Sequence, residues 1–254
     1  MIQLTLIQLD NYGPWTELLG TDREPDLQIL QAEIYADLQR MFALKRGLVF
    51  FNRFDNMIAV SNGISVKDHE LMLRSVSRRY PVSVSMGIGS AESPYEAQVL
   101  ATRVLQDVGS AHSQTRKEVL VQASNDDSGP DYVQIAHIDV NKFTRDVVDR
   151  ESAYQSSIMI YSATSILMRM FANKGAILFF VSGDNFMAIC NGLKKNDFKE
   201  IFDKFEASIN LKLKAGVGFG KNALDALSIA NEGLSLIREK KTNEAIVISE
   251  EEKL

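Results

Sequence analysis

Apolar residues recur along the first half of the chain with two different periods, which predict alternating strands and helices. Short apolar runs typical of strands lie at residues 2–10, 48–51, 57–60 and 82–88. Stretches with apolar residues at intervals of three and four, typical of amphipathic helices, lie at residues 27–42, 67–80 and 94–108. Residues 11–16 are polar, contain Gly and Pro, and predict a loop. The predicted order is β-α-β-β-α-β-α.

The second half predicts the same order of elements. A strand is expected at residues 132–139, a hairpin at 177–190, another strand at 211–219 and an edge strand at 245–249. Helices are expected at about 151–172, 196–209 and 222–238. The turn-rich residues 123–130 predict a linker. We therefore expect an N-terminal domain at residues 1–122 and a C-terminal domain at 131–254.

The halves share sequence as well as pattern, which indicates an internal duplication. Residues 50–63 (FFNRFDNMIAVSNG) and 179–192 (FFVSGDNFMAICNG) agree in Phe-Phe, Asp-Asn, Ala and Asn-Gly without a gap, 129 positions apart. The same offset places Asp10 on Asp139. The repeat is domain-sized, so each copy can hold its own core. Each half is predicted to be an α+β, ferredoxin-like sandwich, an antiparallel sheet with helices on one face.

Composition excludes several classes of protein. The chain has 254 residues and a net charge of −5, which argues against broad nucleic-acid binding but not against a nucleotide ligand. Its one cysteine excludes an internal disulfide and fits a reducing compartment. We found no apolar run long enough to span a bilayer and no basic start typical of a signal peptide. We expect a cytoplasmic protein without a membrane partner.

Two common ligand motifs are absent from the sequence. The histidines and the cysteine show no zinc spacing, so no zinc centre is expected; they are His69, His112, His137 and Cys190. No P-loop motif occurs. Glycines at 87, 89, 216, 218 and 220 superficially resemble nucleotide loops, but they lie in the fourth strand of each repeat. We interpret them as packing glycines.

Each half carries one aspartate at the end of its first strand and one at the tip of its hairpin. The pairs are Asp10 with Asp55 and Asp139 with Asp184. Because the first strand and the hairpin are neighbours in this topology, each pair can converge. Two carboxylates beside open backbone carbonyls suit Mg²⁺ with phosphate oxygens completing its shell. The alternative is ordinary turn chemistry at the hairpin and a loop cap at the strand end.

Strand alternation places the polar pairs on one side of the sheet. Gln8 and Asp10 face one side, as do His137 and Asp139. We expect this side to be the open face, opposite the helices. Phe51 and Phe180 are also expected there, and an open face with such residues should be buried against a partner, such as the other half of the chain.

The loop after the first strand has an unusual composition. Its candidate substrate-binding residues are Asn11, Tyr12, Gly13, Trp15 and Thr16. A glycine there permits close backbone approach to an anion, and the aromatic rings could stack on a base. A structural tryptophan in a tight turn is the alternative. Basic side chains that could hold phosphates are Arg53 and Lys142, with Lys45, Arg46 and Arg145 nearby, although most surface cations are only solvated.

Several of these segments resemble known families. Residues 182–186 resemble the GG(D/E)EF hairpin of diguanylate cyclases and class III nucleotidyl cyclases, and residues 139–143 resemble their strand-end metal motif. The segments that resemble archaeal GTP cyclohydrolase III cover nearly the whole chain; they include QLDNYGPWT (8–16), RFDNMIAVSNG (53–63), YVQIAHID (132–139) and GDNFMA (183–188). That family is a duplicated, cyclase-like palm enzyme.

The resemblance implies a function and a site. It implies Mg²⁺-dependent hydrolysis of GTP, activated by a monovalent cation such as K⁺, that opens the guanine imidazole ring at C8 and releases two phosphates. The product would be 2-amino-5-formylamino-6-ribosylamino-4(3H)-pyrimidinone 5′-phosphate, which feeds deazaflavin and flavin synthesis. Asp10 and Asp55 would be catalytic, and Asn56 and Asn185 would contact substrate. His137 is a candidate base, unless it is a hydrogen-bonded structural histidine.

Other interpretations of the same residues stay open. A nucleotidyl or diguanylate cyclase would share the carboxylate pairs, but the glutamate position of the GG(D/E)EF hairpin holds Asn56 and Asn185. A regulator that binds GTP without changing it would share the architecture. The resemblance also implies a homo-oligomer, with a tetramer expected, although no sequence feature sets the number.

Overall fold

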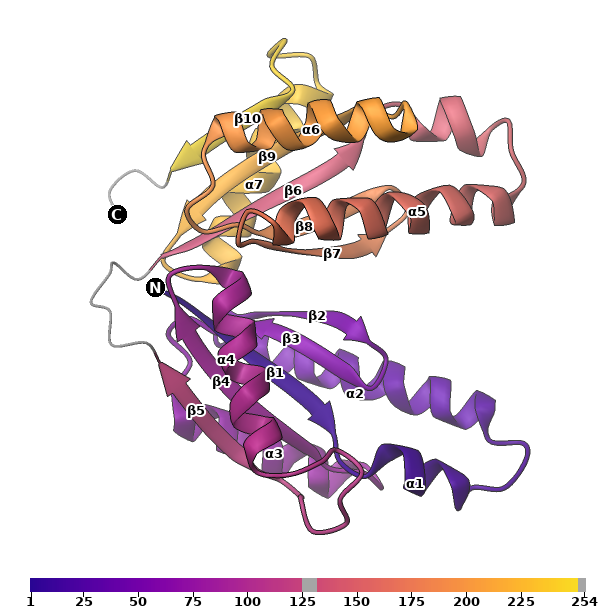
Figure 1. The fold of residues 1–254 in the computed structure, drawn as a ribbon, viewed down its shortest axis with the longest axis vertical. Helices are drawn as coiled ribbons and strands as arrows, with labels where there is room; N and C mark the ends of the chain where they lie inside the picture. The colour runs from indigo at the N-terminus through magenta and orange to yellow at the C-terminus, as the bar shows by residue number, and fades with distance from the viewer. Residues whose placement is uncertain (125–131, 251–254) are drawn as a thin grey trace. The chain divides into compact units, whose positions relative to one another are not determined.

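The computed structural model describes residues 1–124 and 132–250 (Figure 1). The chain folds as two compact units, Met1–Glu92 with Glu96–Asp131 and Ser93–Tyr95 with Tyr132–Leu254. Ala123 and Ser124, which begin the predicted linker, belong to a strand. The rest of that linker, residues 125–130, lies outside the described residues.

The first unit is built on a five-stranded sheet. Its strands are β1 (Ile2–Leu9), β2 (Leu48–Arg53), β3 (Asn56–Val60), β4 (Val84–Ala91) and β5 (Leu120–Ser124). Its helices are α1 (Tyr12–Glu17), α2 (Glu24–Leu44), α3 (Val66–Arg79) and α4 (Pro94–Asp107). The strand order is β2-β3-β1-β4-β5, with β1 antiparallel to β3 and to β4. The predicted β-α-β-β-α-β order is confirmed.

The second unit repeats this arrangement, which confirms the predicted α+β class and the duplication. Its strands are β6 (Val133–Val140), β7 (Ile177–Ser182), β8 (Asn185–Ile189), β9 (Leu213–Gly220) and β10 (Ile246–Glu250). Its helices are η1 (Thr144–Val148), α5 (Ala153–Ala172), α6 (Lys195–Ile209) and α7 (Ala223–Arg238). The strand order is β10-β9-β6-β8-β7, so β6 occupies the central place that β1 has in the first unit.

Three details within this fold class differ from the sequence prediction. Each sheet is mixed rather than wholly antiparallel, because β5 pairs parallel with β4 and β10 parallel with β9. The hydrophobic pattern does not predict β5. The segment after β1, predicted as a loop, forms the short helix α1, and the segment after β6 forms the single π-turn η1.

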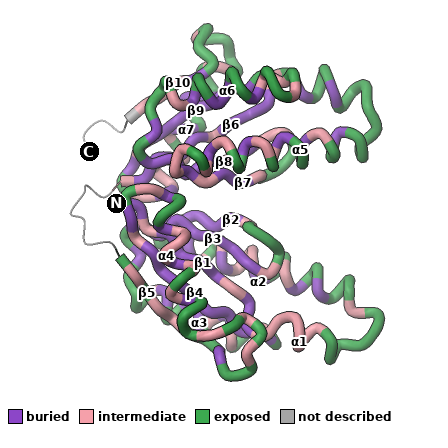
Figure 2. The backbone as a smooth tube through the Cα atoms, viewed as in Figure 1, coloured by how far each residue is buried: buried purple, intermediate pink, exposed green. Residues whose placement is uncertain are grey.

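Helices also cover both faces of each sheet rather than one. The core under α2 and α3 contains Val84 and Met86 of β4. Gly87 and Gly89, which alternate with them, face the other way and lie against Ala101 and Ala97 of α4. In the second unit, α5 and α6 cover one face while α7 packs on the other (Figures 1 and 2). The face predicted to be open is therefore partly covered.

The strand glycines are packing residues, as predicted. A Cβ at Gly87 would overlap the carbonyl oxygen of Ala101, and a Cβ at Gly216 would overlap that of Ala230. Since side chains of any size would push the helix away, these glycines let α4 and α7 approach the backbone of β4 and β9. The helix that follows each fourth strand is thereby fixed on the face that carries the strand-end aspartate.

Phe51 and Phe180 do not lie on this face, which corrects the sequence interpretation. Phe51 packs against the core under α2 and α3 and stacks on Tyr35 of α2, with ring centroids 4.0 Å apart. Phe180 packs against the core under α5 and meets Tyr161 of that helix edge-on. Both share a strand face with core residues two positions earlier, as alternation requires.

Candidate functional site

In both units the hairpin tip lies against the end of the central strand. The amide of Leu9 donates to the carbonyl oxygen of Asp55 at 3.1 Å. The amide of Val140 donates in the same way to Asp184, also at 3.1 Å. The fold therefore brings the backbone of Asp55 to the strand end that carries Asp10, and that of Asp184 to the strand end that carries Asp139.

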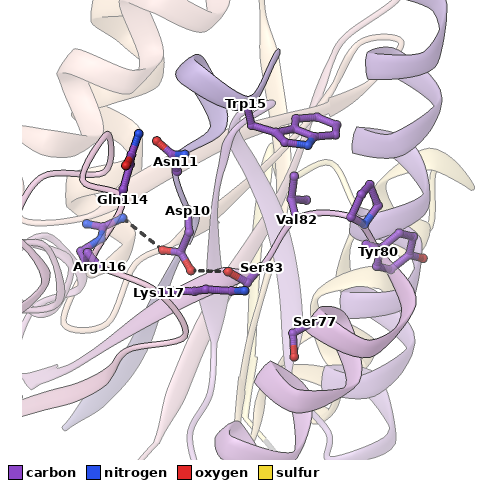
Figure 3. A pocket seen from close by; sticks show the side chains of 11 residues that line it. Asp10, Asn11, Trp15, Ser77, Tyr80, Val82, Ser83, Gln114, Arg116 and Lys117 are labelled. Carbon is purple, nitrogen blue, oxygen red and sulfur yellow. Dashed lines mark hydrogen bonds and ion pairs between the residues drawn. The ribbon is translucent and has the colours of Figure 1, made fainter. Parts of the chain in front are cut away.

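Asp10 is buried although it directly follows a strand, with 5% of the residue accessible. Ser85 Oγ donates to Oδ1 at 2.6 Å, and Ser83 Oγ donates to Oδ2 at 2.8 Å. The amide of Glu118 also donates to Oδ2, at 2.9 Å. The segment between α4 and β5 closes over the carboxylate, which explains the burial (Figure 3).

The same segment supplies Arg116, a residue that the sequence pattern does not single out. Its Nη2 lies 3.5 Å from Oδ1 of Asp10, and only 4% of the residue is accessible. Residues 109–119 have no periodic pattern, so nothing local indicates that this cation returns to the first strand.

A pocket of about 210 Å³ opens beside Asp10 at this end of the sheet (Figure 3). It is lined by Asp10, Asn11, Trp15, Ser77, Tyr80, Pro81, Val82, Ser83, Gln114, Arg116 and Lys117. One wall is polar and includes two cations, while Trp15, Tyr80 and Val82 form an apolar wall. Such a mixture suits a ligand with both an anionic and an aromatic part.

Asp55 is the more accessible carboxylate of the first pair. Its side chain is 37% exposed, and its charged partner is Arg53, whose Nη2 lies 3.2 Å from Oδ2. Arg53 is itself exposed, so the pair is weakly held. Asp55 can consequently accept another cation with little rearrangement of the unit.

The buried polar atoms without a hydrogen-bond partner gather around this pair. Among the described residues they are Asn11 Oδ1, Asn56 Nδ2, Arg116 Nε and Arg116 Nη2. Asn11 follows Asp10 and Asn56 follows Asp55, while Arg116 lies beside Asp10 at a distance too long for a hydrogen bond. Because an unpaired buried polar atom is costly, such a concentration needs an explanation, and a missing ion or ligand is one.

The residues after Asp10 are held by local contacts. Asn11 adopts the left-handed conformation, with φ of 49°, and its carbonyl oxygen accepts from the amide of Trp15 at 2.9 Å. Tyr12 Oη accepts from Gln31 Nε2 at 2.6 Å, and burial raises the pKa of Tyr12. Thr16 Oγ1 donates to the carbonyl oxygen of Gly13 at 2.7 Å. Of these residues, Asn11 and Trp15 line the pocket.

The second pair is arranged differently. Asp139 is buried, and Arg238 of α7 donates to its Oδ2 through Nε at 2.9 Å and Nη2 at 2.6 Å. Lys214 Nζ lies 3.4 Å from the same oxygen. The sequence pattern predicts neither cation. Two positive side chains therefore already neutralise the strand-end carboxylate of the second unit.

His137 is enclosed by amide side chains. Its Nδ1 lies 2.6 Å from Oδ1 of Asn231, and its Nε2 lies 3.0 Å from Oδ1 of Asn185. Both ring nitrogens are thus occupied within its own unit, which favours a structural histidine over a base. In the first unit Gln8, which pairs with Asn56 across the sheet, donates to Oδ1 of Asn56 at 2.8 Å. Lys142 lies in the turn after β6, with φ of 59°.

Asp184 is the half-buried partner of Asp139. Its pKa is raised, first by burial and then by the negative charge of Asp139. The two carboxylates are therefore close enough to repel each other. The part of the chain that the structure describes contains no group of three or more His, Cys, Asp or Glu side chains that could hold a metal.

Replacing Asp184 with asparagine is expected to stabilise the protein at pH 7. Because the pKa of Asp184 is higher in the folded state, the folded protein binds this proton more tightly than the unfolded chain. The resulting loss in the free energy of unfolding is absent below the ordinary carboxyl pKa of about 3.9. It grows as the pH rises through the pKa that Asp184 has in the folded state. Urea unfolding at several pH values should show a higher free energy of unfolding for Asp184→Asn than for wild type at pH 7, and this difference should shrink on acidification. A pH-independent difference would contradict this.

Two β-α-β-β-α-β sandwiches, each with a carboxylate pair at one end of its sheet, define a duplicated α+β protein. The model of the family GTP cyclohydrolase III matches residues 1–251. The chain therefore belongs to the GTP cyclohydrolase III family, which is a family of enzymes. None of the helices in the described part of the chain combines the length and the apolar character that a bilayer span requires.

Curated relatives agree over nearly the full chain. GTP cyclohydrolase III of Methanobrevibacter smithii is 51% identical over 242 residues, covering 94% of each chain. The protein of the same name from Methanothermobacter thermautotrophicus is 50% identical, covering 94% of this chain and 95% of that one. The GTP cyclohydrolase III of Methanocaldococcus jannaschii is 49% identical, covering 94% of this chain and 89% of the relative.

Solved structures match about half of the chain. The GGDEF domain of DgcB from Caulobacter crescentus, in complex with c-di-GMP, has a TM-score of 0.39 and 13% identity. The match covers 46% of this chain and 77% of the DgcB chain. A bacterial light-regulated adenylyl cyclase has a TM-score of 0.38 and 17% identity, covering 47% and 77%.

Proposed function

We propose that this protein is a GTP cyclohydrolase that, with Mg²⁺, opens the imidazole ring of GTP and releases two phosphates. Family membership and relatives of that name at about half identity support GTP as the substrate. The product is 2-amino-5-formylamino-6-ribosylamino-4(3H)-pyrimidinone 5′-phosphate. The first unit holds the triphosphate at Asp10 and Asp55.

The cluster of unpartnered polar atoms around Asp10 carries this assignment. Asn11 Oδ1 is a buried oxygen without a donor, which is the kind of ligand that Mg²⁺ accepts. Arg116 Nε and Nη2 are buried donors without a hydrogen-bond acceptor, which suit a phosphate oxygen. A cation bound to a phosphate would satisfy both kinds of atom. In the second unit, none of the described residues has such an orphaned atom.

The reaction needs water at two kinds of centre. Addition of one water to C8 and cleavage of the C8–N9 bond leave a formyl group on N7, and hydrolysis of two phosphoanhydride bonds releases the two phosphates. Mg²⁺, when bound, would neutralise the phosphate oxygens and polarise phosphorus. Asp10 and Asp55 would hold that ion. Arg116, Lys117 and Arg53 would hold phosphate oxygens, and Trp15 offers an aromatic surface for the base.

A cyclase and a regulator are the alternatives. In a cyclase the ribose 3′-hydroxyl would attack the α-phosphate by two-metal chemistry. Asn56, at the position of the GG(D/E)EF glutamate, is buried and accepts from Gln8, which weighs against a second acidic ligand there. A regulator would bind GTP unchanged and would have no need of two carboxylates in each unit.

Incubation of the purified protein with GTP and Mg²⁺ separates these functions. We expect loss of purine absorbance, two phosphates released per GTP, and a product whose mass matches the ring-opened monophosphate. Omission of Mg²⁺ with added EDTA is the control and should preserve GTP. A cyclic or dinucleotide product with an intact purine would identify a cyclase, and unmodified GTP at stoichiometric occupancy would identify a regulator.

Further features follow from the family resemblance and belong to the same proposal. K⁺ is expected to raise the rate when it replaces a bulky organic cation in the buffer. A homotetramer and a cytoplasmic location are also expected. Size-exclusion chromatography with light scattering tests the assembly, and a strict monomer with full activity would refute the oligomer without affecting the site.

A further inference from the structure

Asp10 and Arg116 are opposite charges that lie side by side in the first unit without a hydrogen bond between them (Figure 3). Arg116 Nη2 is 3.5 Å from Oδ1 of Asp10, and only 2% and 3% of the two side chains are accessible. Nη1 of Arg116 donates to the carbonyl oxygen of Gly109 at 3.3 Å, but Nε and Nη2 have no partner. A guanidinium beside a carboxylate ordinarily closes onto it through short, paired hydrogen bonds. The separation of this pair therefore needs a cause.

The other hydrogen bonds to Asp10 supply that cause. Ser85 is fully buried, and its Oγ donates to Oδ1 of Asp10 at 2.6 Å. Ser83 Oγ and the amide of Glu118 donate to Oδ2 at 2.8 and 2.9 Å. Because each carboxylate oxygen accepts about two hydrogen bonds, Oδ2 is filled and Oδ1 keeps one lone pair. Ser85 thus takes the place on Oδ1 that Arg116 would otherwise occupy.

Ser85 also fixes the segment that carries Arg116. Its Oγ accepts from the amide of Val119 at 3.1 Å. The carbonyl oxygen of Val119 in turn accepts from the amide of Met86 at 2.8 Å, which joins this segment to β4. One hydroxyl group therefore contacts both the carboxylate and the backbone that follows the guanidinium. This double contact fixes the distance between the two charged groups.

The second unit has neither the carboxylate nor the hydroxyl groups at these places. Asn141 takes the place of Asp10, as the matching backbone hydrogen bonds and sheet registers show. Lys212 and Lys214 take the places of the two serines. The hydroxyl groups thus accompany the carboxylate in one copy and are replaced where it is replaced in the other.

We propose that Ser85 is a positioning residue whose hydroxyl group keeps Asp10 and Arg116 apart. The separation leaves one lone pair of Oδ1 for the metal ion and two guanidinium nitrogens for phosphate oxygens. Without the hydroxyl group, Arg116 closes onto Oδ1, and the ion pair consumes both groups. The inference rests on the proposed function, which assigns the carboxylate to Mg²⁺ and the guanidinium to phosphate.

Binding of inorganic tripolyphosphate to the full-length protein in EDTA tests this role without metal and without turnover. Ser85→Ala should weaken binding, measured by calorimetry, by on the order of 10-fold, as expected when a charged donor is withdrawn from the ligand. Ser85→Thr keeps the hydroxyl group and should bind within a few-fold of wild type. Ser61→Ala is the matched control and should bind as wild type does, because Ser61 is a fully buried serine of the same unit whose Oγ accepts from Thr5 instead.

The Asp10→Asn background separates positioning from general support of the fold. Without the negative charge at residue 10, Arg116 is not drawn onto that side chain when the hydroxyl group is lost. Ser85→Ala should therefore cause no further loss of tripolyphosphate binding in this background, and the double-mutant cycle should show coupling between the two residues. A serine that only supports the fold would weaken binding by the same factor in both backgrounds.

Three results would overturn the inference. They are wild-type protein that binds no tripolyphosphate, equal affinity of wild type and folded Ser85→Ala, and the same loss in both Asp10 backgrounds. If circular dichroism shows that Ser85→Ala does not fold, Ser85→Cys replaces it and must show the loss, since a thiol is a weak donor of similar size. Unchanged GTP after incubation with Mg²⁺, beside tripolyphosphate binding that depends on Ser85, would refute the proposed reaction and leave the positioning role standing.

Discussion

Replacing Asp55 with asparagine is expected to lower GTP turnover by on the order of 10²–10³-fold, the effect of losing one preorganised electrostatic group. The free energy of unfolding should change by less than about 1 kcal/mol, because the exposed pair with Arg53 contributes little. Asparagine preserves the shape of the side chain but removes the charge that would hold Mg²⁺. Steady-state phosphate release and urea unfolding measure the two effects.

Asp184→Asn is the matched control, because it makes the same change at the corresponding hairpin. With Arg238 and Lys214 already at Asp139, we expect turnover to stay within a few-fold of wild type. Asp10→Asn is a less clean test than Asp55→Asn. Asp10 is buried and lies beside Arg116, so its replacement also leaves a buried cation uncompensated. Loss of turnover in Asp184→Asn with full turnover in Asp55→Asn would reverse the roles of the units.

The second large effect concerns stability. Gly216→Ala is expected to lower the free energy of unfolding by on the order of 3 kcal/mol, because overpacking forces backbone shifts. The added Cβ would overlap the carbonyl oxygen of Ala230 and the amide nitrogen of Leu234. Neither backbone atom can move unless α7 leaves β9. Urea unfolding followed by circular dichroism measures the change.

Gly13→Ala serves as the control for this prediction. Its added Cβ would lie 3.4 Å from Nε2 of His112, an ordinary contact, and Gly13 does not have a positive φ. Its free energy of unfolding should change by less than about 1 kcal/mol. Equal stability of the Gly216→Ala and Gly13→Ala proteins would show that the close approach of α7 to β9 is not required.

The element order and the hairpins could be predicted because they depend on local periodicity. Asp-Asn at each hairpin tip, the apolar runs beside it and the 129-residue repeat are all visible in the sequence. Helical period, however, does not say which face of a sheet a helix covers. Gly87 and Gly89, alternating with buried Met86, were the available sign that α4 packs closely on the second face.

The charged partners of the strand-end aspartates could not be predicted from local periodicity. Arg116 reaches Asp10 across more than a hundred positions, from a segment without a repeating pattern. Arg238 reaches Asp139 from the last turn of α7. Spacing along the chain identifies carboxylates that share one end of a sheet. It does not identify the cations that tertiary packing brings to them, and those cations distinguish the two units.

Anomalous diffraction from crystals grown with Mn²⁺ and a non-hydrolysable GTP analogue tests the central claim most directly. We predict a manganese peak within coordination distance of Asp10 and Asp55, with the triphosphate beside Arg116, and no peak at Asp139 and Asp184. A manganese peak at Asp139 and Asp184 alone, with Asp10 still bound to Ser83 and Ser85, would contradict the assignment of the triphosphate to the first unit.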